Sequence, residues 1–159
     1  MENLDLTVNV GDYKLNVRAA GIVIHNHRVL FHKSPKNDYY ALIGGRVKIG
    51  EDSVNTIKRE IMEEMGKEIE IVKEFAYIEN FFAMKGNKYH ELMTVYQVEF
   101  VNENDKKIED TLKCVEPNKE LSFEWIDIDK LNEFDIRPRL IKEAFGKNLP
   151  VHIVNKEIS

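Results

Sequence analysis

Three glutamates, Glu60, Glu63 and Glu64, lie close together in the segment REIMEEMG, residues 59–66. On a helix they would share about 100° of arc. Pairs of like charge three or four residues apart cost roughly 0.2–0.5 kcal/mol each, and the end of a helix disfavours negative charge because the macrodipole is negative there. A hard divalent cation such as Mg²⁺ or Mn²⁺ removes both penalties, since it prefers carboxylate oxygens. The pattern therefore indicates a metal site, against the plainer alternative of a solvated acidic face.

A glycine-rich segment, GGRVKIGE at residues 44–51, precedes the acidic one. Its glycines allow the backbone to approach a ligand or metal closely. It is not a phosphate-binding P-loop, because no Gly-Lys-Ser or Gly-Lys-Thr follows. Arg59 can reach an acid on this loop, and Glu51 is the obvious candidate. Such an ion pair would hold the loop against the helix.

The elements that position these residues are strands around one central helix. An apolar stripe with a period of 3.6 residues predicts a helix over residues 53–65, with Asp52 or Ser53 as N-cap and Gly66 as C-terminal stop. A final helix is predicted at residues 137–146, and residues 102–120 are expected to form a polar connection. Strand patterns occupy residues 6–10, 13–24, 29–33, 39–45, 69–82, 89–100 and 121–128. This order predicts an α/β or α+β sandwich.

Bulk properties narrow the class of protein. A chain of 159 residues, 43% of them hydrophobic, fits one globular domain. The formal net charge of −5 disfavours a broad nucleic-acid surface. Cys114 is the only cysteine, which excludes an internal disulfide and a cysteine cluster for zinc and favours a reducing compartment. The longest apolar run, residues 19–24, is too short to span a bilayer, and the first residues lack the pattern of a signal peptide. We expect a soluble, cytoplasmic protein with no membrane partner.

None of the histidines considered is interpreted as a catalytic group. His25 and His27 lie in a predicted turn, and we interpret them as solvated residues rather than as metal ligands. His32 and His90 lie in predicted strands and are interpreted as hydrogen-bonded or wall residues.

One contiguous pattern resembles a known signature. Gly45, five residues, Glu51, seven residues and then residues 59–66 resemble the Nudix box of the Nudix hydrolases. All seven fixed letters stand at the family's spacing, which chance alone would give on the order of a few times per million such chains. The surrounding strands and the segment FEWIDIDKL extend the resemblance to about residues 15–145. Lys67 stands where the family usually has an apolar residue, and Ile43 where it usually has proline.

The resemblance implies a single domain with a Nudix-type α/β/α sandwich and a mixed β-sheet, an N-terminal strand extension and a short C-terminal tail. It also implies hydrolysis of a pyrophosphate bond in a nucleoside diphosphate linked to another group, with Mg²⁺ or Mn²⁺. Carried over residue by residue, it assigns the metal ligands Gly44 (through its carbonyl), Glu60, Glu63 and Glu64 and the orienting ion pair Arg59 and Glu51.

Further roles follow from the same resemblance. One carboxylate accepts the proton of the attacking water; members of the family differ in which one, and we assign Glu60. A glutamate outside the box often assists, and we favour Glu91 over Glu116 and Glu120. Substrate contacts are expected from Gly45, Arg46, Phe81 and Phe82.

The expected partner is a small nucleotide-type molecule, and the protein is expected to be a monomer or a homodimer. The alternative is a catalytically silent Nudix-type domain that senses a nucleotide, although such domains usually lose acids of the box. Proline marks that accompany NADH and ADP-ribose cleavage are missing between Lys67 and Pro117, and the tyrosine associated with dinucleoside polyphosphate cleavage is not evident. The sequence leaves the identity of the nucleotide open.

Overall fold

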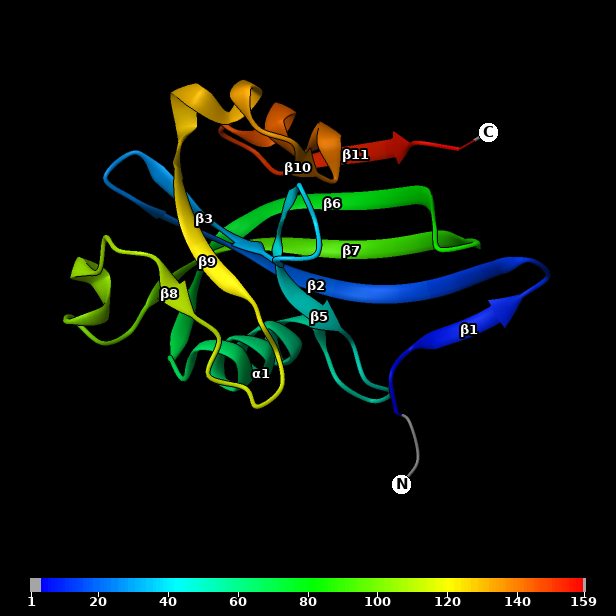
Figure 1. Cartoon of the computed structure of the whole chain (residues 1–159), viewed down its shortest axis with the longest axis horizontal. Helices are drawn as coiled ribbons and strands as arrows, with labels where there is room; N and C mark the ends of the chain where they lie inside the picture. The colour runs from blue at the N-terminus through cyan, green and yellow to red at the C-terminus, as the bar shows by residue number, and fades with distance from the viewer. Residues whose placement is uncertain (1–3, 159) are drawn as a thin grey trace.

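Three long strands form the centre of the fold: β2 (Tyr13–His25), β6 (Ile69–Met84) and β7 (Asn87–Phe100). The computed structural model describes residues 4–158, and in it β7 runs parallel to β2 and antiparallel to β6 (Figure 1). The main path of the sheet has the order β10-β4-β3-β2-β7-β6-β11. The other elements, in chain order, are β1 (Thr7–Val10), β3 (Arg28–Lys33), β4 (Tyr40–Ala41), β5 (Ile43–Arg46), α1 (Ser53–Met65), η1 (Asp105–Lys107), β8 (Leu112–Lys113), β9 (Ser122–Asp127), η2 (Ile128–Glu133), β10 (Ile136–Arg137), η3 (Arg139–Ala144) and β11 (Val151–Lys156).

The central helix α1 has the limits that its sequence predicts. Asp52 is the N-cap, and its Oδ1 accepts a hydrogen bond from the Asn55 N–H at 2.8 Å. Gly66 ends the helix in the left-handed region, with φ 67°, and its N–H bonds the Met62 carbonyl. Ile57 and Ile61 on the predicted stripe are completely buried. α1 is the only α-helix in the described part of the chain.

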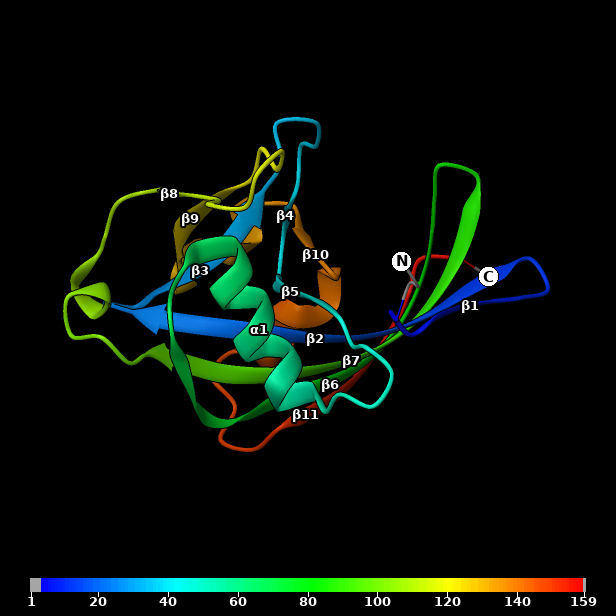
Figure 2. The same cartoon turned by 90° about the horizontal axis from the view of Figure 1, so that it is seen from below.

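Both faces of the sheet are covered, which makes three layers. Figure 2, seen from the side of α1, shows the helix lying across the central strands. β2 alternates between the two cores, because Ala19 and Val23 pack with α1 while Ala20 and Ile22 pack on the opposite side. On that opposite side the 3₁₀ helices η2 and η3 cover the sheet, above it in Figure 1. The predicted sandwich with a mixed sheet is confirmed.

Four details differ from the sequence prediction. The single strand expected at residues 39–45 is divided into β4 and β5. The final helix is the 3₁₀ helix η3, six residues long, and not an α-helix. The expected polar connection at 102–120 contains η1 and the short strand β8. The expected C-terminal tail contains β11, which pairs with β6 in parallel and so extends the sheet.

Among residues 4–158, no helix is long and apolar enough to cross a lipid bilayer.

Candidate active site

Two glycines on β5 bring the backbone close to the helix. Gly44 and Gly45 pair with Ala20 and Ala19 of β2. A Cβ at Gly45 would lie 2.2 Å from Cδ of Glu60, and a Cβ at Gly44 would lie 2.1 Å from a backbone oxygen of β2. At Gly44 a side chain would clash with the backbone of β2, and at Gly45 it would displace the Glu60 carboxylate, so the two glycines let a carboxylate of α1 lie against the strand.

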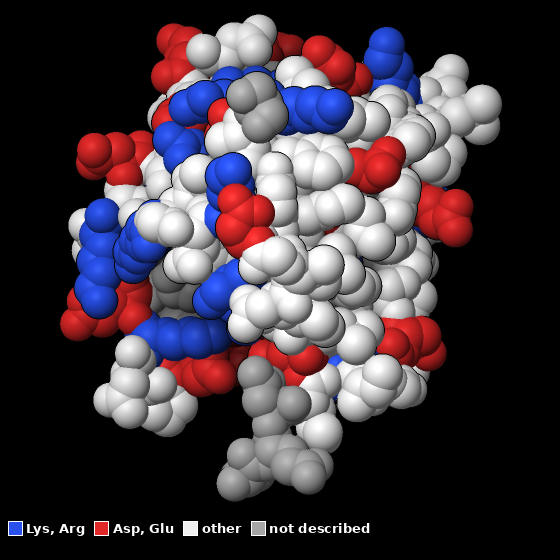
Figure 3. Space-filling model, turned by 90° about the vertical axis from the view of Figure 1, so that its right-hand side faces the viewer, with Lys and Arg blue, Asp and Glu red and all other residues white. Residues whose placement is uncertain are grey.

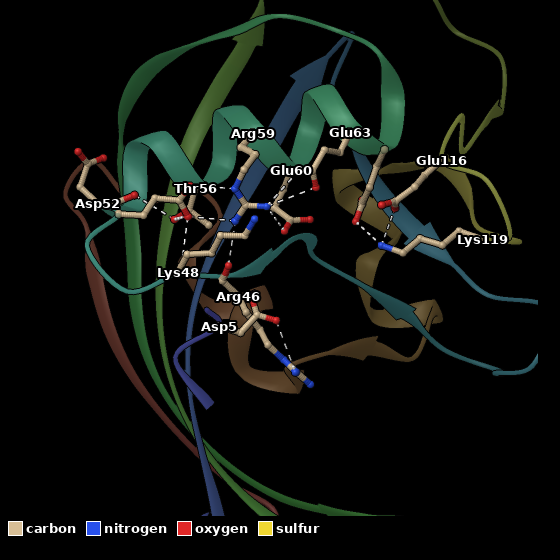
Figure 4. A network of polar contacts seen from close by, with 12 residues as sticks. Asp5, Arg46, Lys48, Asp52, Thr56, Arg59, Glu60, Glu63, Glu116 and Lys119 are labelled. Atoms are coloured by element: carbon tan, nitrogen blue, oxygen red, sulfur yellow. Dashed lines mark hydrogen bonds and ion pairs between the residues drawn. The ribbon is translucent and has the colours of Figure 1, made fainter. Parts of the chain in front are cut away.

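Arg59 is the centre of the polar network at the helix (Figure 4). Its guanidinium forms two hydrogen bonds with Glu51, Nε to Oε2 at 2.8 Å and Nη2 to Oε1 at 3.0 Å. Nη2 also donates to the Arg46 carbonyl at 3.1 Å. Nη1 donates to Glu60 Oε1 at 2.9 Å and lies 3.3 Å from Glu63 Oε2. One side chain therefore fixes the loop and two of the three helix carboxylates together.

The ion pair that the resemblance implies is thus present in the structure. Hydrogen bonds from Arg59, and from the Thr56 hydroxyl at 2.7 Å, lower the pKa of Glu51 to about 2 against desolvation by burial. Glu51 in turn raises the pKa of Arg59. Glu51 also accepts the backbone N–H of Lys48 at 3.3 Å, which closes the loop on itself.

The three helix glutamates have very different environments. The side chain of Glu63 is 42% exposed, that of Glu60 12% and that of Glu64 only 6%. Glu64 is buried, like its neighbour Met65, so the alternative of a solvated acidic face does not describe it. Burial raises the pKa of Glu64 from its ordinary 4.5 to about 7, and the positive charge of Lys119 only partly opposes this effect.

A loop between β8 and β9 covers Glu64. The N–H of Val115 donates to the Glu64 carbonyl at 2.8 Å. Nζ of Lys119 lies 3.5 Å from Glu64 Oε1 and 2.8 Å from Glu116 Oε2 (Figure 4). Of the three acids considered outside the box, Glu116 is the one that the structure brings to the helix carboxylates. Sequence reasoning missed Lys119, because its partner Glu64 is 55 residues away and no local pattern marks the pair.

Glu91, the favoured additional acid, lies in the wall of a cavity of about 250 Å³. It is 5% exposed and accepts a hydrogen bond from Asn16 Nδ2 at 2.9 Å. Its one hydrogen bond in the described part of the chain is to Asn16, and none joins it to the polar network of α1. The cavity is lined by residues of β2, β3, β4, β5, β6, β7 and β10, together with flanking residues.

The two candidate aromatic residues lie on different faces of β6. Phe82 lines the cavity and stacks on Tyr89, with ring centroids 4.8 Å apart and planes 9° from parallel. Phe81 instead packs against His90 at 4.4 Å, and Nζ of Lys156 lies 5.7 Å from its ring. Phe82 is thus placed to contact a ligand of the cavity.

Two arginines stand side by side in the cavity wall. Arg18 on β2 and Arg46 on β5 are paired directly across the two strands, and both line the cavity. Like charges in this register repel one another. Arg46 lies 3.9 Å from the carboxylate of Asp5. Figure 3 shows the face of the molecule that lies on the right-hand side of Figure 1, and on one half of that face Lys and Arg side chains gather around a hollow. The pair favours an anionic group such as a phosphate.

His32, on β3, is a residue of the cavity wall. Its Nδ1 is enclosed and has no hydrogen-bond partner in the part of the chain that the structure describes. Burial, followed by the charges of Arg18 and Lys119, lowers the pKa of His32 to about 4, so the imidazole is neutral at pH 7.

A second group of possible ligand atoms lies on turns remote from the box. Atoms of His27, Asp127 and Asp129 fall within 4.8 Å of one another. They are already paired, since His27 Nε2 lies 3.1 Å from Asp129 Oδ1 and Asp127 accepts the Asp129 N–H. His27 and Asp129 are exposed, and the interpretation of His27 as a solvated turn residue stands.

Comparison with known proteins identifies the family. The profile of the NUDIX domain family matches residues 15–145. The chain therefore belongs to the Nudix family, whose box its residues 45–66 contain. No curated protein is similar enough in sequence to be matched.

Solved structures share the fold. A MutT NUDIX hydrolase from Burkholderia pseudomallei superposes with a TM-score of 0.64 at 23% identity, covering 82% of this chain and 98% of that one. The ORF135 protein of E. coli gives 0.60 at 18% identity, covering 87% and 93%. An ADP-ribose pyrophosphatase from Streptococcus suis gives 0.59 at 10% identity, covering 87% and 98%.

Proposed function

We propose that this Nudix hydrolase cleaves a pyrophosphate bond in a nucleoside diphosphate linked to another group, with Mg²⁺ or Mn²⁺ held by Glu60, Glu63, Glu64 and the carbonyl of Gly44. The observation that carries the proposal is the buried Glu64 carboxylate. It is 6% exposed, and its one cationic partner among residues 4–158, Lys119, lies 3.5 Å away. A carboxylate in this position is costly unless a cation accompanies it.

The donor set fits a hard divalent cation. All four groups offer oxygen, which Mg²⁺ and Mn²⁺ prefer. The missing Cβ at Gly45 leaves the space into which the Glu60 carboxylate projects. When bound, the ion neutralises phosphate oxygens and makes water a better nucleophile.

The residues around the proposed metal site have distinct roles. Arg59 orients Glu60 and Glu63 and, through Glu51, holds the β5–α1 loop in place. We assign proton acceptance to Glu60: Arg59 bonds its Oε1, and no donor in the described part of the chain bonds its Oε2. Glu116, brought near by Lys119, takes the role of the additional acid in place of Glu91.

The cavity arginines bind the negatively charged part of the substrate. Arg18 and Arg46 are adjacent, and Arg137 lines the same cavity with its guanidinium 4.1 Å from the Tyr39 ring. Guanidinium groups bind phosphate oxygens in a bidentate manner. Their charges supply the local attraction that a chain with a net charge of −5 otherwise lacks.

A panel of nucleoside triphosphates, sugar nucleotides and dinucleotides, assayed with Mg²⁺ and with Mn²⁺, tests the proposal. We expect a metal-dependent release of product that Glu64→Gln lowers by about a hundredfold or more. Glu68→Gln, at an exposed glutamate just beyond the helix, is the matched control. Activity of Glu64→Gln within about tenfold of the parent would remove Glu64 from the site. Stabilisation by a nucleotide without any turnover would favour the sensing alternative.

A further inference from the structure

Glu91 is a buried carboxylate that the proposed hydrolytic chemistry does not use. It lies on β7 directly beside Asn16 of β2, and both side chains are nearly inaccessible, at 5% and 1%. Asn16 Nδ2 donates to Glu91 Oε2 at 2.9 Å, and the Thr7 hydroxyl donates to Asn16 Oδ1 at 2.7 Å. This chain of hydrogen bonds fixes the orientation of the amide and, through it, of the carboxylate.

The Glu91 carboxylate can accept more hydrogen bonds than the described part of the protein donates to it. An ionised carboxylate accepts at about four positions, and within residues 4–158 only Asn16 donates to Glu91. Buried polar groups normally have their partners. Glu91 lines the cavity, so the remaining donors have to come from what the cavity holds.

The other walls indicate a flat heterocycle. The stacked rings of Phe82 and Tyr89, with Met93 beside them in the lining, offer apolar and aromatic surface. A volume of about 250 Å³ lies just below the usual range of about 300–1,000 Å³ for drug-sized ligands, so the cavity is too small for a whole dinucleotide.

Adjacent arginines and a carboxylate in one cavity fit a nucleotide: the guanidinium groups suit its phosphate and the carboxylate suits a base with N–H donors. Among the common bases, guanine presents two neighbouring donors, N1–H and the 2-amino group. Adenine and cytosine place a ring acceptor beside their amino group, and uracil places a carbonyl on each side of its N–H. Those acceptors would face the carboxylate lone pairs and be repelled.

We propose that Glu91 is the specificity-determining residue of this cavity and selects a guanine base by accepting hydrogen bonds from N1–H and the 2-amino group. The inference rests on the proposed function to the extent that the nucleotide bound here is the substrate. Asn16 is a positioning residue, because it acts on the ligand only through Glu91.

Calorimetric binding of nucleoside monophosphates, without metal, tests the inference independently of turnover. We compare GMP with IMP, which lacks only the 2-amino group, and with AMP, CMP and UMP. Loss of one hydrogen bond to a charged group should weaken IMP binding about tenfold or more relative to GMP. The other three bases should bind weaker still.

Glu91→Gln replaces one acceptor oxygen with a donor and should reduce the preference for GMP over IMP to about twofold or less. Glu99→Gln, an exposed glutamate on the same strand, should leave the preference unchanged. A melting curve of each variant shows whether it is folded. If Glu91→Gln fails to fold, the comparison of GMP with IMP in the parent protein still decides.

Equal affinity of the parent for GMP and IMP would overturn the inference, as would a GMP preference that survives Glu91→Gln. Binding of 2′- or 3′-deoxy-GMP tests whether the carboxylate contacts the ribose instead. If loss of a ribose hydroxyl weakens binding to the parent more than loss of the 2-amino group does, and if Glu91→Gln removes this difference, Glu91 binds the sugar and the inference is wrong. Selective GMP binding without hydrolysis of any guanine nucleotide would refute the proposed function and leave this inference standing.

Discussion

Glu64→Gln should stabilise the metal-free protein at alkaline pH while it removes activity. The substitution keeps the shape of the side chain and deletes a charge that is almost fully buried, since the Glu64 side chain is 6% exposed. An ionised carboxylate loses hydration there, and Lys119 at 3.5 Å compensates only in part. Glutamine carries no such penalty.

The size and sign of the effect follow from the pKa. Burial raises the pKa of Glu64 from 4.5 to about 7, and at about 1.36 kcal/mol per pKa unit this difference is worth up to about 3.4 kcal/mol. Because the folded state holds the proton more tightly, this contribution to stability is complete below pH 4.5 and is lost as the pH rises through 7. Glutamine does not titrate, so the variant should be more stable than the parent by up to about 3 kcal/mol at pH 8 and by less than about 1 kcal/mol at pH 5.

Urea unfolding in EDTA at pH 5 and pH 8 measures both free energies. Glu68→Gln, which removes an exposed charge just beyond the same helix, should follow the parent at both values. If Glu64→Gln and the parent lose the same free energy of unfolding between the two pH values, Glu64 is not a buried carboxylate of raised pKa, and the argument for a cation at this position fails.

Three other outcomes check the architecture of the site. Arg59→Ala and Glu51→Ala should be strongly non-additive in turnover, with a coupling of about 1–3 kcal/mol in a double-mutant cycle; simple addition of the two losses would show that the bidentate pair does not act as a unit. Mg²⁺ at a hundred times its Kd should add about 2.7 kcal/mol of stability, or about 5–10 °C in Tm for a chain of this size, and a Glu60→Lys variant that keeps the full response would place the ion elsewhere. Gly45→Ala should lower metal affinity and turnover because the new Cβ would lie 2.2 Å from Cδ of Glu60, and an alanine variant with unchanged affinity would show that Glu60 has no need of that space.

The sequence predicts most of the sheet because the strands are long and alternate regularly. The helix α1 has both its stripe and its caps in the local sequence, and its limits are correct. The errors lie where distant contacts decide. β11 is a strand because it pairs with β6, and strand formation depends strongly on such neighbours. Ile141 and Ala144, three residues apart and both buried, fit the 3₁₀ period of η3 as well as an α-helix.

In the candidate site, too, some features follow from the local sequence and others depend on contacts between distant segments. Arg59 and Glu51 are eight residues apart on adjoining elements, and their pairing could be predicted from spacing. The burial of Glu64 could not, because it depends on the loop carrying Val115 and Lys119, more than fifty residues further along the chain. Residue type makes Glu91 a candidate catalytic acid, whereas its position beside Asn16 in the register of β7 against β2 places it in the cavity wall.

We expect the polar network around Arg59 to determine which bond is cleaved, and the cavity to determine which substrate binds. The polar network around Arg59 comes from β5, the following loop and α1, which are contiguous in the chain. The cavity is built from strands spread over most of the sequence, and it meets the network at Arg46, which follows Gly45 and also lines the cavity. A substitution in the cavity wall, such as Glu91→Gln, should therefore change which nucleotide binds without changing which bond is broken. A substitution of Arg59 should lower the rate for every substrate alike, because its contacts lie with the helix carboxylates and the loop.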